Sequence, residues 1–152
     1  MRILFPIAAA AVLMGMAAPA AAERWYRVGG NDDNATYVDA DSIATGGNVR
    51  YARSLSIYAQ PLDGRVYGGQ ILAEYHCAER YFRTLEYGYY GPNGTLMNTE
   101  ASETMREHKA VETGSINEQI AVFICTGSGG VAVGSPWQDA PGQLRGRGST
   151  AK

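Results

Sequence analysis

Residues 49–90 alternate between apolar and polar side chains, and this pattern constrains the fold more than any other feature of the sequence. Three successive runs carry the alternation, with the apolar sides Val49, Tyr51, Leu55, Ile57; Ile71, Ala73, Tyr75, Cys77; and Tyr81, Leu85, Tyr87, Tyr89. Arg53 interrupts the first run, which indicates a face partly open to solvent. Because successive side chains of a strand point to opposite faces of a sheet, the pattern predicts half-buried antiparallel strands.

Shorter strands and turns extend this pattern in both directions. Residues 24–28 and 36–38 are strand candidates before it, and residues 95–99 follow it. Residues 91–94 read Gly-Pro-Asn-Gly, a combination that favours a tight turn between two strands. The sequence therefore predicts a meander of about five or six antiparallel strands.

A helical pattern replaces the alternation after residue 113. Ser115 and Glu118 have the spacing of a capping box. The apolar residues that then recur at helical spacing are Ile116, Ile120, Phe123 and Ile124. Gly127 is a suitable residue to end the helix. We therefore predict an α+β fold in which a short C-terminal helix packs on the antiparallel sheet.

The chain has two cysteines, Cys77 and Cys125. Residues 1–22 indicate export, as described in the next paragraph, and in an exported chain such a pair favours a disulfide over a metal site or a redox motif. The bond would tie the helix to the strand that ends at Cys77, and closing this long loop would stabilise the fold by about 4 kcal/mol on the loop-entropy model. Two separate buried thiols are the alternative.

Residues 1–22 have the composition of a signal peptide. Arg2 precedes a mostly apolar run, and three alanines then offer a cleavage site before Glu23. A retained transmembrane anchor is the alternative, since the run approaches the ~20 residues that cross a bilayer. We expect cleavage, with no membrane span and no lipid-modified cysteine in the mature chain. Export then places the protein in the periplasm or at the cell surface.

The composition changes again near residue 127. Residues 23–127 have the size of one domain, whereas residues 127–152 contain seven glycines and two prolines. We predict that residues 128–152 form a flexible Gly-rich tail. The alternative is that Val131, Val133 and Trp137 dock as a further strand.

No catalytic or cofactor-binding constellation stands out. His76 lies in a strand among polar neighbours, as an exposed or edge residue would, and His108 lies in a charged stretch. Aspartates at 32–33 and at 39 and 41 would suit calcium chemically, but turns explain them better and the EF-hand spacing is missing. Without Arg2, 12 Lys and Arg face 15 Asp and Glu, a formal charge of −3 that argues against nucleic acid as a partner. We expect no enzymatic activity, cofactor or metal.

Tyrosine is the most informative residue type. The chain contains ten tyrosines, most of them in the predicted strands. Tyrosine is enriched at protein interfaces because it combines apolar area with a hydroxyl group. The candidate binding face consists of Tyr81, Tyr87, Tyr89 and Tyr90. Ordinary cross-strand aromatic packing is the alternative.

Several segments follow one another in a characteristic order. They are Trp25, residues 37–43, residues 75–83, Gly-Pro-Asn-Gly at 91–94, and residues 114–118 leading to Cys125. In this order and spacing they resemble the surface-adhesin protein E family of Gram-negative bacteria. The resemblance implies a twisted antiparallel sheet with a helix held by a disulfide, a homodimer and, as in the best-known member, attachment to vitronectin and laminin. That member is a lipoprotein, whereas this chain lacks the cysteine for a lipid anchor.

Two functional hypotheses follow. The first is a non-enzymatic envelope protein that binds an extracellular or envelope protein through its sheet face, as a small adhesin does. The second is a periplasmic inhibitor, for example of a lysozyme, or a chaperone-like module, since small disulfide-linked β domains suit these roles equally well. An enzyme would need an active site that residue spacing does not reveal.

Overall fold

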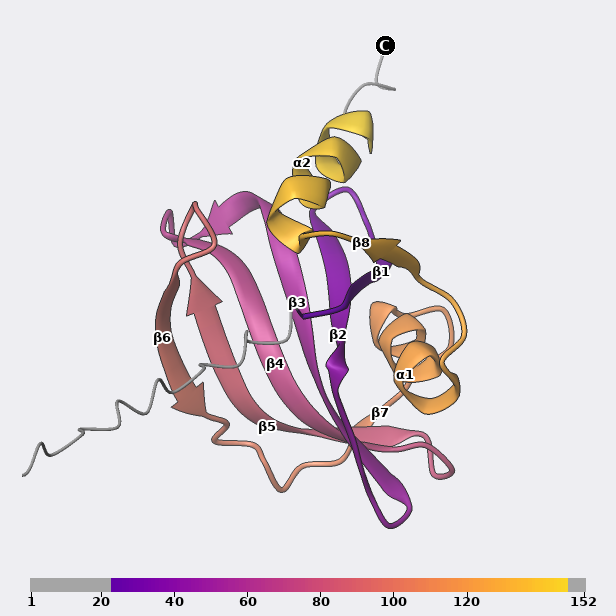
Figure 1. Cartoon of the computed structure of the whole chain (residues 1–152). Helices are drawn as coiled ribbons and strands as arrows, with labels where there is room; N and C mark the ends of the chain where they lie inside the picture. Colours follow the sequence, from indigo (N-terminus) through magenta and orange to yellow (C-terminus); the bar gives the residue numbers. More distant parts are fainter. Residues whose placement is uncertain (1–22, 148–152) are drawn as a thin grey trace, which may run out of the picture.

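The computed structural model describes residues 23–147, so the predicted signal peptide and residues 148–152 lie outside the described residues. Within residues 23–147, one curved antiparallel sheet is packed against two helices (Figure 1). The elements are β1 (Trp25–Gly30), β2 (Asn34–Gly46), β3 (Val49–Leu62), β4 (Val66–His76), β5 (Tyr81–Tyr90), β6 (Leu96–Ala101), β7 (Lys109–Ala110), α1 (Ile116–Thr126), β8 (Val131–Val133) and α2 (Pro136–Arg147). The predicted α+β class is confirmed.

Strands β1 to β6 form the predicted meander, in which each strand pairs with the next. The sheet order is β6-β5-β4-β3-β2-β1-β8, and β7 pairs with β5. The expected five or six strands therefore become eight in the described part of the chain. The two additional strands have only two and three residues, too few for an alternation to be visible in the sequence.

The turn between β5 and β6 forms where the sequence predicts it. The Gly91 N–H donates to the Thr95 carbonyl at 2.9 Å, and the Gly94 N–H donates to the Gly91 carbonyl at 3.2 Å. Gly94 has a φ of +72°, a left-handed conformation that glycine adopts without strain.

In residues 23–147, the two faces of the sheet carry separate hydrophobic cores. Tyr37 and Val38 are both fully buried, and as neighbours in β2 they point to opposite faces. On the Val38 side, α1 packs over β1 to β4. On the Tyr37 side, α2 packs over β2 and β3. The first core includes Val38, Ala73, Tyr75, Phe82, Ile120, Phe123 and Ile124, and the second includes Trp25, Tyr37, Leu55, Ile57 and Ala140.

Helix α1 begins and ends at the predicted residues. The Ser115 hydroxyl accepts a hydrogen bond from the Glu118 N–H at 3.1 Å, and Gly127 caps the other end with a φ of +71°. The predicted disulfide joins Cys77, just after β4, to Cys125 in α1, with their Cα atoms 5.8 Å apart. The helix is therefore covalently tied to the sheet on which it packs.

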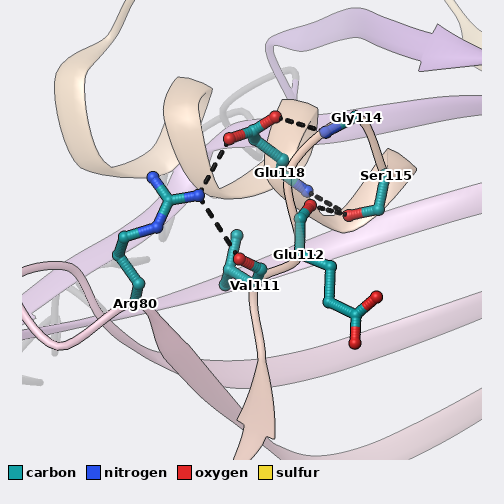
Figure 2. A network of polar contacts seen from close by, with 6 residues as sticks. All are labelled: Arg80, Val111, Glu112, Gly114, Ser115 and Glu118. Carbon is teal, nitrogen blue, oxygen red and sulfur yellow. Dashed lines mark hydrogen bonds and ion pairs between the residues drawn. The ribbon is translucent and has the colours of Figure 1, made fainter.

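Arg80 links the turn after β4 to the start of α1 (Figure 2). Its guanidinium donates to one carboxylate oxygen of Glu118 at 2.9 Å, and the other oxygen accepts from the Gly114 N–H at 2.8 Å. In a capping box Glu118 would bond to the N–H of Ser115, but that N–H donates to the Glu112 carbonyl at 3.2 Å. The Glu118 carboxylate therefore joins the helix start to the β4–β5 turn.

The prediction of a flexible tail is wrong for residues 131–147, which form a strand and a helix. Val131 and Val133 lie in β8, which pairs with β1, as the alternative prediction had it. Trp137 belongs instead to α2, where Ala140 is fully buried against the sheet. The glycine-rich composition conceals this docking, because a few apolar residues and one ion pair hold the segment. The folded unit thus continues past residue 127.

Candidate binding surfaces on the sheet

The two helices leave the β5–β6 edge of the sheet uncovered (Figure 1). α1 packs mainly against β1 to β4, and α2 against β2 and β3. All six residues of the edge strand β6 are exposed. Surfaces open to a partner therefore lie over β3 to β6.

Three tyrosines lie close together on the α1 face, to one side of α1. Tyr87 pairs with Ile71, which belongs to the α1 core, and Tyr89 pairs with Gly69. A Cβ atom on Gly69 would lie 2.6 Å from the hydroxyl of Tyr58, so the Tyr58 side chain occupies the space above this glycine. We call Tyr58, Tyr87 and Tyr89 the tyrosine surface.

The four tyrosines that the sequence suggested as one binding face do not lie together. Tyr87 and Tyr89 remain on one face, but Tyr90 points to the other, where its ring centroid lies 5.9 Å from that of Trp137 in α2. Consecutive residues of a strand cannot share a face, so Tyr90 is separated from Tyr89 by the strand geometry itself.

A β-bulge separates Tyr81 from Tyr87 and Tyr89. Two neighbouring residues of β4 pair with residues two apart in β5, which makes Leu85 an extra residue of β5. An inserted residue reverses the alternation beyond it, so Tyr81 lies on the face opposite Tyr87. Tyr58 was not among the suggested residues, because a distance of 29 positions from Tyr87 gives no local signal.

Charged groups border the tyrosine surface. Burial alone raises the pKa of Tyr87, but its hydrogen bond with Thr84 and the positive charge of Lys109 outweigh burial and lower this pKa. The hydrogen bond from Tyr89 to the Glu100 carboxylate raises the pKa of Tyr89 to about 12. The surface thus combines apolar ring area with one positive and one negative neighbour, as at the polar rim of a protein interface.

The opposite face carries a charged cluster centred on Glu74, which is only 6% exposed. Its carboxylate forms hydrogen bonds with His76 and Arg83. Burial raises the pKa of Glu74, but the hydrogen bonds from His76, Arg83 and Tyr51 outweigh burial, and this pKa is lowered. The hydrogen bonds found among the described residues link Glu74 and His76 to no serine, threonine or cysteine.

His76 is not the exposed or edge residue that the sequence suggested. Its side chain is 18% exposed and belongs to the interior strand β4. The Tyr81 ring stacks on the His76 ring and also on the His108 ring, with a centroid distance of 4.1 Å in both pairs. This stack holds the loop containing His108 against the sheet.

Two of the aspartates considered as calcium ligands, Asp39 and Asp41, contact other groups of the protein. The Asp39 carboxylate accepts from the Asp41 N–H at 3.0 Å, and Asp41 forms an ion pair with Arg24 at 2.7 Å. Among the residues described, no group of three or more His, Cys, Asp or Glu gathers around a metal position.

The comparison with protein families found a match. The family described as Surface-adhesin protein E matches residues 25–126, from β1 to the end of α1. The chain belongs to the surface-adhesin protein E family. The comparison with curated proteins found no match, and the comparison with solved structures found none either.

The adhesin E region contains the complete tyrosine surface and both cysteines. β8 and α2 lie after the last matched residue. Between residues 23 and 147, no helix of this adhesin E protein is long and apolar enough to cross a membrane.

Proposed function

We propose that this chain is an exported, non-enzymatic envelope protein that binds an extracellular protein through the tyrosine surface. Membership of the surface-adhesin protein E family supports an adhesive role. The observation that carries the proposal is the grouping of Tyr58, Tyr87 and Tyr89 on a part of the sheet beside α1, with charged residues at its border.

The physical properties of this surface suit protein binding. Tyrosine side chains lose little conformational entropy on binding and dominate many interface hot spots. The sheet fixes the three rings in advance, which lowers the ordering cost of association. Lys109 and Glu100 would orient a partner that offers an acidic group to one and a basic group to the other.

Surface plasmon resonance with immobilised laminin and vitronectin tests the proposal, because the resemblance described above suggests these two partners. We expect the exported form to bind one of them, and the double variant Tyr87→Ala, Tyr89→Ala to bind at least ~10-fold more weakly, as expected for hot-spot tyrosines. Tyr51→Ala is the control, because it truncates a tyrosine on the opposite face, where Tyr51 pairs with Glu74.

The possible outcomes test the binding site and the adhesive role separately. Unchanged affinity of the double variant, or an equal loss with Tyr51→Ala, contradicts the assignment of the surface. Absence of binding to both matrix proteins contradicts the adhesive role and makes inhibition of lysozyme the next assay. Thermal unfolding of each variant controls for misfolding.

Protease treatment of cells tests the location. A protein that binds extracellular partners must be digested on intact cells. Protection until the outer membrane is opened contradicts the adhesive role and favours a periplasmic inhibitor.

A further inference from the structure

Both tryptophans of the chain line one open cleft on the α2 face. Trp25 comes from β1 and Trp137 from α2, and they enclose the cleft together with Leu55 and Tyr90. The cleft has a volume of about 330 Å³, and the exposed Glu23 stands beside it. This is the face opposite the tyrosine surface.

The aromatic walls of the cleft are held in place by close packing and a hydrogen bond. A Cβ atom on Gly68 or on Gly94 would lie 2.8 Å from the Trp137 ring, so both positions need glycine for this ring to approach. The hydroxyl of Tyr90 donates to the side-chain oxygen of Gln70 at 2.6 Å. The walls are therefore ordered before any ligand arrives.

Glu23 is the charged residue that lines the cleft. The Glu23 carboxylate accepts a hydrogen bond from the Trp25 indole N–H at 2.9 Å, which directs its charge toward the rings. Burial raises the pKa of Tyr90 and the charge of Glu23 adds to this, while Arg53 opposes it more weakly. No lysine or arginine lines the cleft, and Glu23 takes part in none of the ion pairs found among the described residues.

We propose that this cleft binds a quaternary ammonium group, such as the trimethylammonium head of choline. Aromatic ring faces attract organic cations, and a carboxylate supplies the counter-charge. A trimethylammonium group has no N–H donor, whereas a primary ammonium carries three donors that would need acceptors here. The volume lies at the lower end of the range for small-molecule sites.

The two tryptophans make this proposal directly measurable, because both of the chain's tryptophans line the cleft and their fluorescence responds to a ligand there. A form of the chain that keeps Ala22, so that Glu23 carries no α-ammonium group, is titrated with choline chloride and, separately, with 3,3-dimethylbutan-1-ol, which has the same shape without the charge. We expect a saturable fluorescence change with choline, with a Kd on the order of 1 mM, and at least ~10-fold weaker binding of the alcohol. Sodium chloride at equal concentration controls for ionic strength.

Variants test the role of the carboxylate. Glu23→Gln should weaken choline binding by ~10-fold without unfolding the protein, because Glu23 is exposed. Glu79→Gln is the matched control, since Glu79 is also exposed and lies at the turn after β4. Equal affinity for the alcohol, an unchanged Kd in Glu23→Gln, or tighter binding of butylammonium would overturn the proposal, as would the absence of saturation.

The source of the ammonium group is resolved by a second measurement. The protein is sedimented with phosphatidylcholine vesicles. If it sediments with them and Glu23→Gln reduces the bound fraction, the ligand is a lipid headgroup. Choline binding without vesicle binding would assign a free ligand, and both results support the site.

Discussion

The guanidinium of Arg27 in β1 donates to both carboxylate oxygens of Asp139 in α2, at 2.7 Å each. The two side chains are 21% and 22% exposed, and 112 residues separate them in the sequence. The hydroxyl of Tyr37 donates to the same carboxylate at 2.9 Å. These contacts hold α2 on the sheet, and α2 in turn supplies Trp137 to the aromatic cleft.

Replacing Asp139 with alanine should therefore loosen α2. The substitution leaves the Arg27 charge and the buried Tyr37 hydroxyl without their partner, so we expect a loss of about 1–3 kcal/mol in the free energy of unfolding. Urea unfolding followed by tryptophan fluorescence measures it. Gln138→Ala, at an exposed neighbouring position, is the control. An equal effect of the two substitutions would show that the ion pair does not anchor the helix.

The same contact explains why the sequence did not predict α2. A helix is recognised by its own periodicity and caps, and α2 has Pro141 inside it and two glycines. Its docking depends on partners in β1 and β2, more than 100 positions away. By contrast, α1 and the turn at Gly94 could be predicted, because Ser115, Gly127 and Gly94 act on neighbouring residues.

The candidate site was predictable only in part for a related reason. Alternation correctly places Tyr87 and Tyr89 on one face, because both follow the bulge at Leu85. Tyr81 precedes the bulge and therefore lies on the other face. The sequence does not reveal this, because apolar residues recur at regular spacing on both sides of the bulge. Tyr58 joins the tyrosine surface because of the register in which β3 pairs with β4 and β4 pairs with β5. Alternation within one strand does not determine this register.

Removing the disulfide should destabilise the protein strongly. Cys77 and Cys125 are 48 positions apart, and closing such a loop contributes about 4 kcal/mol on the chain-entropy model. We expect the double variant Cys77→Ser, Cys125→Ser to lose about this amount in urea unfolding, and reduction of the wild type to reproduce the loss. Thiol titration of the unfolded, unreduced protein should find no free thiol. Two thiols per chain would show that the bond does not form.

Acid should weaken the fold through Glu74. Its pKa is lower in the folded protein than in the unfolded chain, so the folded state binds fewer protons in acid. The stabilisation is therefore complete above the unfolded pKa of about 4.3 and is lost as the pH falls through the lower folded pKa. Arg80 lowers the pKa of Glu118, so Glu118 also loses its stabilising contribution as the pH falls. Burial raises the pKa of Asp39, so protonation of Asp39 in acid has the opposite effect on stability.

Urea unfolding between pH 7 and pH 3 measures this contribution. Glu74→Gln removes the titrating group, so its stability should fall less between pH 5 and pH 3 than that of the wild type. At pH 7 the variant should be less stable by about 1–3 kcal/mol, because His76 and Arg83 lose a charged acceptor. Parallel pH profiles of variant and wild type would show that Glu74 carries no acid-linked stability.

The two central residues of the tyrosine surface should titrate separately. The usual pKa of tyrosine is about 10. Burial opposes ionisation of Tyr87, but Thr84 and Lys109 outweigh it and lower its pKa, whereas the hydrogen bond with Glu100 raises the pKa of Tyr89 to about 12. In an NMR titration of ring-labelled tyrosines, assigned with Tyr87→Phe and Tyr89→Phe, Tyr87 should ionise at a lower pH than Tyr89.

Two variants test the charged neighbours of these tyrosines. Lys109→Met should raise the pKa of Tyr87 and leave the pKa of Tyr89 unchanged, and Glu100→Gln should lower the pKa of Tyr89 alone. Identical titration curves for the two tyrosines would show that their charged neighbours do not contact them in solution.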